Sequence, residues 1–235
     1  MDSTHAGEYD ECLTKAKVLT YNPPSFQLLE TLLWTPEEGY FLLERHLDRL
    51  RESAEYFDFQ CDIDKIRKQL HENQSEAWDD ARKVRFTLNT DGTFEIENLP
   101  LPENSSANPV ILQLASSPVN PENVFLYHKT TNRRVYEQAV KEAEAGDDVI
   151  LYNTRHEITE SCIANVVLEL DGALYTPPVR CGLLGGTFRD KLLSDGIIKE
   201  RTIKKLEIEQ AANIYLVNSV RKWRRAMLKN HDHAQ

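Results

Sequence analysis

The spacing of apolar residues predicts a β-hairpin followed by an amphipathic helix in the first part of the chain. Apolar runs cover Phe26–Trp34 and Tyr40–Leu43, and the residues between them, 35–39, include a proline and a glycine, which favour a turn. From Glu44 to Phe57 the apolar residues recur at intervals of three and four, so a helix over Glu44–Phe57 would have one apolar face.

A second helix and a second hairpin are predicted before a break in the apolar pattern. The helix is expected over Asp64–Glu72. The hairpin strands are Val84–Leu88 and Phe94–Ile96, which flank Asp91-Gly92, a dipeptide typical of tight turns. The segment from Leu99 to Pro109 is rich in Pro, Ser and Asn, and therefore favours an interdomain linker.

This break predicts a small N-terminal α/β domain over residues 25–102, a linker over residues 103–109 and a larger C-terminal domain over residues 110–235. Residues 1–24 are mainly polar and end in two prolines, so they are expected to form a mobile leader. The C-terminal domain is expected to contain strands over Val110–Leu114, Val149–Tyr152, Val166–Leu170, Leu174–Thr176 and Ile214–Val217, and helices over Asn132–Glu144 and Phe188–Ser194. This order of elements is typical of a mixed α/β fold.

Composition narrows the class of protein. With 235 residues, of which 40% are hydrophobic, the chain can bury a large core. Its net charge of -10 disfavours nucleic acid and anionic membranes as partners. No apolar run reaches the roughly 20 residues of a membrane-spanning helix, and the first residues lack the apolar core of a secretory signal. The four cysteines form no CxxC pair, which predicts no metal site and fits a reducing cytoplasm.

One glycine-containing turn is a candidate anion site. Gly185-Gly186-Thr187 comes at the start of a predicted helix, where unpaired amides can bind a phosphate and glycine allows a close approach to the backbone. The turn matches neither common nucleotide-binding glycine motif, so an ordinary turn at the start of a helix is the alternative.

Single residues offer weaker signals. Lys129 lies in a predicted loop before a helix, where partial burial could make its amine nucleophilic. The alternative for Lys129, and for Arg49 on its predicted helix, is an ordinary surface side chain, because most lysines and arginines are surface residues. Glu160 is expected to precede a strand that starts near Ile163, and its simplest role is a surface carboxylate. Cys162 is interpreted as a packing residue.

Five sequence blocks, in this order, resemble the class IV aminotransferases, the fold type IV group of pyridoxal-phosphate enzymes. The resemblance runs from about Phe26 to Ala226. The blocks are Phe41-Leu-Leu-Glu-Arg-His-Leu-Asp-Arg-Leu50, His128-Lys-Thr-Thr-Asn-Arg133, Ile158-Thr-Glu-Ser-Cys-Ile-Ala-Asn165, Gly182-Leu-Leu-Gly-Gly-Thr-Phe-Arg-Asp190 and Val217-Asn-Ser219. The resemblance implies the two-domain α/β fold of the D-amino acid aminotransferase-like enzymes, a pyridoxal 5'-phosphate cofactor, no metal, and a homodimer. It also implies that Lys129 belongs to the C-terminal domain.

The same resemblance implies roles for individual residues. Lys129 would form the Schiff base with the cofactor, and Glu160 would pair with the pyridine nitrogen. The residues implied for the phosphate and its surroundings are Arg49, Gly186, Thr187, Asn218 and Ser219. Many relatives have proline where this chain has Gly185. Thr31, Arg85 and Arg221 are candidates for binding the substrate, and each could instead be an ordinary surface or strand residue.

Three interpretations of the reaction follow from the resemblance. Within the family the likeness favours the aminodeoxychorismate lyases, which implies formation of 4-aminobenzoate and pyruvate from 4-amino-4-deoxychorismate, a reaction of folate biosynthesis. The alternative enzyme is an aminotransferase that acts on branched-chain or D-amino acids, or other amines, with a keto-acid acceptor. A noncatalytic cofactor-binding protein is disfavoured by the presence of Lys129, Glu160 and Arg49.

Overall fold

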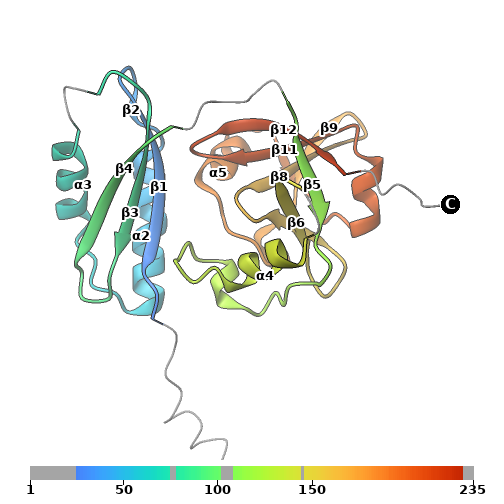
Figure 1. Cartoon of the computed structure of the whole chain (residues 1–235), viewed down its shortest axis with the longest axis horizontal. Helices are drawn as coiled ribbons and strands as arrows, with labels where there is room; N and C mark the ends of the chain where they lie inside the picture. Colours follow the sequence, from blue (N-terminus) through green and yellow to red (C-terminus); the bar gives the residue numbers. More distant parts are fainter. Residues whose placement is uncertain (1–24, 75–77, 102–107, 144–145, 230–235) are drawn as a thin grey trace, which may run out of the picture.

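The chain forms two β-sheets that lie side by side (Figure 1). The computed structural model describes residues 25–74, 78–101, 108–143 and 146–229. Residues 28–100 build a four-stranded sheet, here called the N-terminal sheet, and residues 110–228 build an eight-stranded sheet, the C-terminal sheet. The leader expected at residues 1–24, and residues 103–107 of the expected linker, lie outside the described residues.

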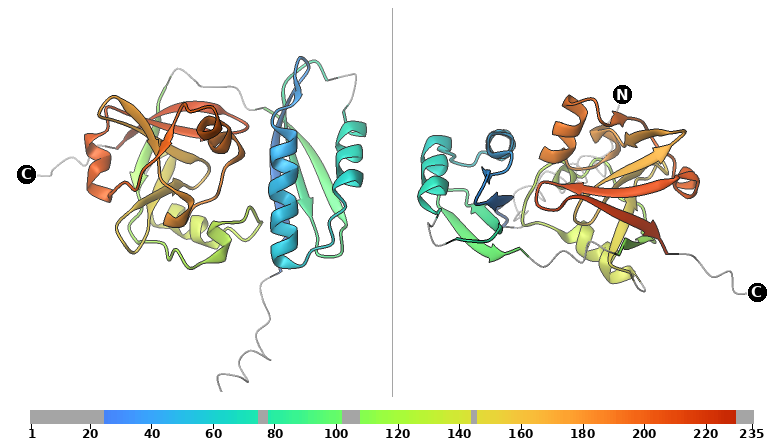
Figure 2. Two further views of the ribbon diagram at one scale, coloured as in Figure 1. Left: turned by 180° about the vertical axis from the view of Figure 1, so that it is seen from behind. Right: turned by 90° about the horizontal axis from the view of Figure 1, so that it is seen from above.

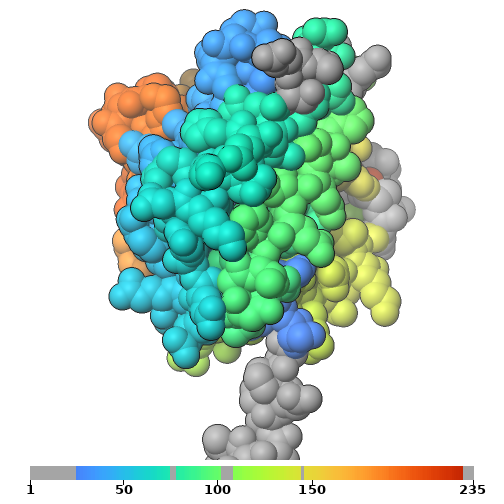
Figure 3. Space-filling model, turned by 90° about the vertical axis from the view of Figure 1, so that its left-hand side faces the viewer, coloured from blue at the N-terminus to red at the C-terminus, as the bar shows by residue number. Residues whose placement is uncertain are grey.

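The N-terminal sheet is antiparallel, with strand order β2-β1-β3-β4. Its elements are β1 (Leu28–Thr35), β2 (Gly39–Tyr40), α2 (Leu43–Phe57), α3 (Ile63–Glu72), β3 (Arg82–Leu88) and β4 (Phe94–Pro100). Both helices pack on one face of this sheet, and Figures 2 and 3 show α2 beside the C-terminal sheet and α3 farther from it.

Side chains of β1 and β3 alternate between two faces, as the pleat of a strand requires. Leu28, Leu32 and Phe86 are on one face and pack against the apolar stripe of α2, which includes Leu47 and Leu50. The alternate residues, such as Leu29, Thr31 and Arg85, face the opposite way. The second face is therefore free to line a cavity.

The hairpin predicted before α2 is shorter than expected. We predicted a strand over Tyr40–Leu43, and this was wrong, because Leu42 adopts a left-handed conformation (φ 57°) and the helix begins at Leu43. A left-handed leucine cannot continue a strand. The helix predicted over Glu44–Phe57 is confirmed by α2. The residue that follows its last turn, Asp58, again has a left-handed conformation and ends the helix.

The C-terminal sheet closes on itself. Its order is β10-β9-β8-β11-β12-β5-β6-β7, and β7 also pairs with β8, so six of the strands form a ring. Its strands are β5 (Val110–Leu114), β6 (Asp148–Tyr152), β7 (Ile158–Ser161), β8 (Asn165–Leu170), β9 (Ala173–Thr176), β10 (Lys199–Glu200), β11 (Asn213–Asn218) and β12 (Lys222–Leu228). Its helices are η1 (Val124–Leu126), α4 (Arg134–Glu142), η2 (Val179–Cys181), α5 (Thr187–Ser194) and η3 (Lys205–Gln210).

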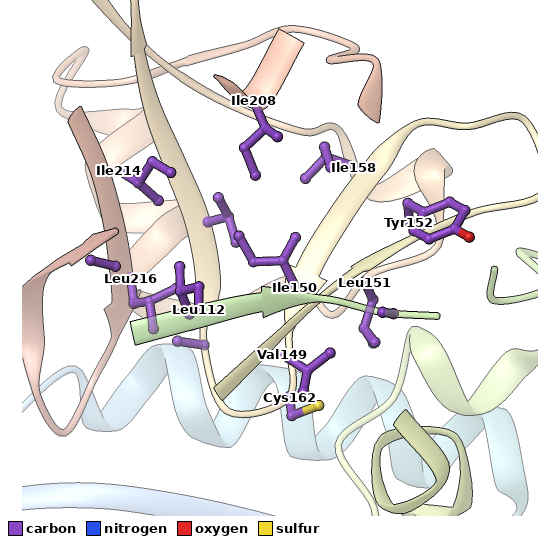
Figure 4. Close-up of a cluster of buried hydrophobic side chains, with 14 of the residues drawn as sticks. Leu112, Val149, Ile150, Leu151, Tyr152, Ile158, Cys162, Ile208, Ile214 and Leu216 are labelled. Carbon is purple, nitrogen blue, oxygen red and sulfur yellow. The ribbon is translucent and has the colours of Figure 1, made fainter. Parts of the chain in front are cut away.

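The ring of strands surrounds an apolar core. Side chains from β5, β6, β8 and β11 meet there, among them Leu112, Ile150 and Leu216 (Figure 4). A smaller cluster packs α5 against β8 and β11 through Phe188 and Val167, and Phe41 from the N-terminal sheet joins it. The ring centroids of Phe41 and Phe188 are 5.8 Å apart. The start of α5 is thereby held next to α2.

Three strands of the C-terminal sheet differ from the prediction. We expected Glu160 to precede a strand starting near Ile163, but Glu160 lies inside β7, and Ile163 is an exposed turn residue between β7 and β8. β10 and β12 were not predicted. The helix expected over Asn132–Glu144 is observed as the shorter α4.

No helix in the described ranges is long and apolar enough to span a membrane. Cys61, Cys162 and Cys181 have free thiols.

Candidate active site

A cavity of about 430 Å³ lies between the two sheets. Its walls come from β1, α2 and β3 on one side and from the Lys129 loop, β7, the start of α5 and the β11–β12 turn on the other. It contains every residue that the sequence singled out for a site: Thr31, Arg49, Arg85, Lys129, Glu160, Gly186, Thr187, Asn218, Ser219 and Arg221. Residues up to 190 positions apart in the chain therefore share one cavity.

The main chain around Lys129 is tied to β1 of the N-terminal sheet. The Leu29 amide donates to the Lys129 carbonyl and the Thr131 amide donates to the Gln27 carbonyl, both at 2.9 Å. Burial and the nearby Arg49 guanidinium lower the pKa of Lys129 to about 8. At neutral pH the Lys129 amine is therefore unprotonated in a larger fraction of molecules than the amine of an ordinary lysine. An unprotonated amine can act as a nucleophile or as a base.

Glu160 has a buried carboxyl group that accepts three hydrogen bonds. Its Oε1 accepts from the Tyr136 hydroxyl at 2.7 Å and from the Leu184 amide at 3.1 Å, and its Oε2 accepts from Asn165 Nδ2 at 3.2 Å. Burial, only partly offset by these donors and by Lys129, raises the pKa of Glu160 to about 7. A carboxyl of this kind can share a proton with a ring nitrogen.

The start of α5 faces the cavity with unpaired amides. Gly186 is the N-cap residue, and a Cβ placed on it would lie 2.0 Å from the Asn165 Oδ1 atom. No side chain fits there, so the backbone stays accessible to a ligand. Arg49 Nη1 donates to the Gly185 carbonyl at 3.1 Å. Together, the amides and the guanidinium suit a phosphate dianion.

Behind Arg49 lies a buried group of polar residues. Glu30 Oε1 accepts from Arg49 Nε at 2.9 Å, and Glu30 Oε2 accepts from Arg49 Nη2 at 2.6 Å. His46 Nδ1 lies 2.7 Å from Glu30 Oε2, and His46 Nε2 lies 3.2 Å from the Thr187 hydroxyl.

Two of the candidate substrate residues, Thr31 and Arg85, lie on the face of β1 and β3 that lines the cavity, and Arg221 lies in the β11–β12 turn. Thr31 and Arg85 are paired across the two strands, and Arg85 forms an ion pair of 3.0 Å with Glu97. On the other side, Ser219 donates its hydroxyl to the Thr31 carbonyl at 3.3 Å. Burial and the neighbouring Arg224 lower the pKa of Arg221.

Sequence reasoning missed several residues of the cavity and its support. Tyr136, Glu30 and His46 had no role in the prediction, although His46 lies within the first of the five blocks. Asn165 lies within a block that resembles the family, so its position carried a signal. Cys162 fits the packing interpretation, because burial raises the pKa of its thiol to about 12.

The sequence as a whole matches one protein family. Residues 27–227 match the family model of amino-transferase class IV. The chain belongs to this family, and it is a pyridoxal-phosphate-dependent enzyme with the fold type IV architecture. The cavity agrees with the cofactor, since it combines a half-buried lysine, a buried carboxyl and an anion site.

The proteins that resemble this chain are named for two different activities, lyase and aminotransferase. A Schizosaccharomyces pombe protein named "Putative aminodeoxychorismate lyase" is 32% identical over 204 residues, covering 83% of this chain and 86% of the relative. A Mesorhizobium loti structure named "Putative amino-acid aminotransferase" is 33% identical with a TM-score of 0.81, covering 87% of this chain and all of that one. The 4-amino-4-deoxychorismate lyase structure from Pseudomonas aeruginosa shares the fold at 22% identity, with a TM-score of 0.72 and coverage of 86% and 82%.

Proposed function

We propose that this chain is a 4-amino-4-deoxychorismate lyase that releases 4-aminobenzoate and pyruvate. The observation that carries the proposal is the charge of the cavity wall, which includes the basic residues Lys83, Arg85, Arg133, Arg221 and Arg224. The proposed substrate has two carboxylates, which such a wall would attract. The relative from S. pombe supports the same reaction.

In this proposal Lys129 binds the cofactor covalently through its Nζ atom, is freed when the amine of the substrate takes its place, and then accepts the proton from the aminated carbon of the substrate. A pKa of about 8 suits this transfer near neutral pH. When bound, the cofactor supplies a protonated ring that withdraws electrons from that carbon. Glu160 holds the proton at the ring nitrogen. Loss of the ring proton and cleavage of the ring C–O bond leave an aromatic ring, and the departing enolpyruvate gains a proton on its methylene carbon to become pyruvate.

Arg49, the amides of Gly186 and Thr187, and the side chains of Asn218 and Ser219 are proposed to hold the cofactor phosphate. Thr31, Arg85 and Arg221 are proposed to contact the substrate. These assignments are supported by their shared cavity and by the fit of amides, a guanidinium and a hydroxyl to a dianion.

We also propose a cytoplasmic homodimer. The three free thiols in the described residues are compatible with a reducing compartment. Ile163 lines the cavity with 59% of its surface exposed, and a second copy of the chain could cover it. Light scattering on the purified protein tests the dimer: a mass of one chain would contradict it.

The reaction is tested by supplying 4-amino-4-deoxychorismate to the purified enzyme without any keto acid. We expect equimolar 4-aminobenzoate and pyruvate over many turnovers, because the nitrogen stays on the product. Lys129→Ala is expected to lose at least about 10³-fold in rate, since it lacks both the covalent attachment and the base. No release of 4-aminobenzoate by the wild type would refute the lyase.

An aminotransferase is the second candidate, supported by the M. loti relative, whose whole length aligns with this chain. Such an enzyme would need a keto acid for continued turnover and would move nitrogen from branched-chain amino acids, D-amino acids or other amines onto it. Transfer of ¹⁵N from a panel of these donors to a keto acid would favour this candidate.

A further inference from the structure

The phosphate site is backed by a buried polar pair that the proposed reaction does not use. Glu30, on β1, is 3% exposed, and His46, on α2, is 1% exposed. Burial of an ionisable pair requires that every polar atom has a partner. Here the partners are Arg49 and Thr187, two of the residues assigned to the phosphate.

The carboxylate of Glu30 fixes the direction of these hydrogen bonds. Burial alone would raise its pKa, but the charge of the Arg49 guanidinium and the hydrogen bonds from Arg49 and the His46 ring lower the pKa of Glu30 to about 2. The carboxylate is therefore ionised and can only accept. His46 Nδ1 must then carry a hydrogen and donate it to Glu30 Oε2.

The remaining nitrogen of His46 sets the orientation of Thr187. Burial lowers the pKa of His46, against the opposing effect of Glu30, so the ring is neutral at neutral pH and its Nε2 has a lone pair. The Thr187 hydroxyl lies 3.2 Å away and donates to that lone pair. The hydroxyl proton is then directed toward His46, and Thr187 offers the cavity its backbone amide.

Arg49 is oriented by the same carboxylate. Its Nε and Nη2 atoms donate to Glu30, and Nη1 donates to the Gly185 carbonyl. Three of the five guanidinium hydrogens are thus used, and two are left for an anion. His46 and Arg49 are three residues apart on α2, so both lie on one face of that helix.

We propose that Glu30 and His46 are positioning residues of the phosphate site, which hold the Arg49 guanidinium and the start of α5 in one buried hydrogen-bonded chain across the two sheets. This inference rests on the proposed assignment of Arg49, Gly186 and Thr187 to the cofactor phosphate. Neither Glu30 nor His46 contacts the phosphate in this arrangement. Their effect is on the geometry of the groups that do.

The test compares two ligands that differ only in the phosphate. Dissociation constants of pyridoxal 5'-phosphate and of pyridoxal are measured by absorbance on each cofactor-free variant, and their ratio isolates the contribution of the phosphate. His46→Asn keeps an amide donor near Glu30 but has no acceptor at the position of His46 Nε2, where the Thr187 hydroxyl lies. We expect it to weaken binding of pyridoxal 5'-phosphate about 10-fold and to leave pyridoxal binding unchanged.

Glu30→Gln removes the charge that orients Arg49, so a loss of about 100-fold is expected for the phosphorylated ligand alone. Ser53→Ala is the matched control, because it removes another hydrogen bond of α2, the one to His128 Nδ1, without touching the phosphate site. Its ratio should equal that of the wild type. If Glu30→Gln does not fold, His46→Asn still decides the question.

Three outcomes would overturn the inference. Equal losses for the two ligands would mean that Glu30 and His46 only support the fold. Unchanged ratios in both variants, while Arg49→Ala changes the ratio, would refute the positioning role and keep the phosphate site. If Arg49→Ala itself leaves the ratio unchanged, the assignment of the phosphate site fails and this inference fails with it.

Discussion

At the scale of single residues, two buried glutamates in the same molecule are expected to depend on pH in opposite ways. The pKa of Glu160 is raised to about 7, so the folded chain holds that proton more tightly than the unfolded chain. Its contribution to stability is complete below pH 4.5 and is lost as the pH rises through 7. The pKa of Glu30 is lowered to about 2, so its contribution is present above pH 4.5 and is lost as the pH falls toward 2.

Glu160→Gln should therefore stabilise the cofactor-free protein above pH 7, because the amide cannot ionise. The expected gain in the free energy of unfolding is at most about 3 kcal/mol, and it should shrink as the pH is lowered toward 5. Glu30→Gln should destabilise the protein at the same alkaline pH. Thermal unfolding across this pH range measures both, and a Glu160→Gln variant less stable than the wild type at pH 8 would contradict the assignment.

Adjacent glycines at the start of α5 provide another contrast. Gly186→Ala puts a methyl group 2.0 Å from Asn165 Oδ1, so the loop must move and the affinity for pyridoxal 5'-phosphate should fall at least about 10-fold. Gly185→Ala meets nothing closer than a Val179 methyl at 3.9 Å and should bind as the wild type does. Equal affinities of the two variants, measured by absorbance titration, would show that the loop adapts.

The sequence predicted the residues whose chemistry is tied to a motif, such as Lys129, Glu160 and Arg49, and the cavity contains all of them. It did not reveal Tyr136 or His46. Both lie on helices whose apolar spacing explains their burial without any role in a site, and their polar atoms find partners only through contacts distant in sequence. A linear pattern does not contain such contacts.

At the scale of elements, α2 serves the core and the cavity with different faces. Leu47 and Leu50 pack into the N-terminal core, while His46 and Arg49 point toward the phosphate site. Leu50→Ala is expected to cost roughly 2–5 kcal/mol in the free energy of unfolding, since the side chain is 2% exposed. The ratio of the two ligand affinities should not change.

Leu206→Ala is the control for this substitution, because Leu206 is 78% exposed in η3. It should change stability by less than about 0.5 kcal/mol. Urea unfolding distinguishes the two variants. A small loss for Leu50→Ala would mean that α2 repacks around the missing side chain.

The elements that could be predicted were those with a clear period. The apolar stripe of α2 repeats over 15 residues and was recognised. β7 has only four residues, and all of them are buried, including Thr159 and Glu160, so neither alternation nor an apolar run marks it as a strand. In β12, charged residues interrupt the pattern, and its pairing with β11 and β5 defines the strand.

At the scale of the whole molecule, the two sheets contribute different parts of one binding site. Cofactor binding should therefore protect both sheets from hydrogen exchange, with increased protection in β1, α2 and the start of α5. η3, which does not line the cavity, should be unaffected and serves as the internal control. Protection restricted to the C-terminal sheet would contradict a site shared by both.

The backbone bonds between β1 and the Lys129 loop also bear on how substrate reaches the cavity. Leu28 and Thr130 form an antiparallel bridge, which is made by two backbone hydrogen bonds, from the Leu29 amide to the Lys129 carbonyl and from the Thr131 amide to the Gln27 carbonyl. A hinge that swung the sheets apart would break these bonds and carry the lysine amine away from the other groups. We therefore expect substrate and product to diffuse in and out of the cavity while the two sheets keep their relative positions. Access would then be controlled by movements of side chains at the entrance.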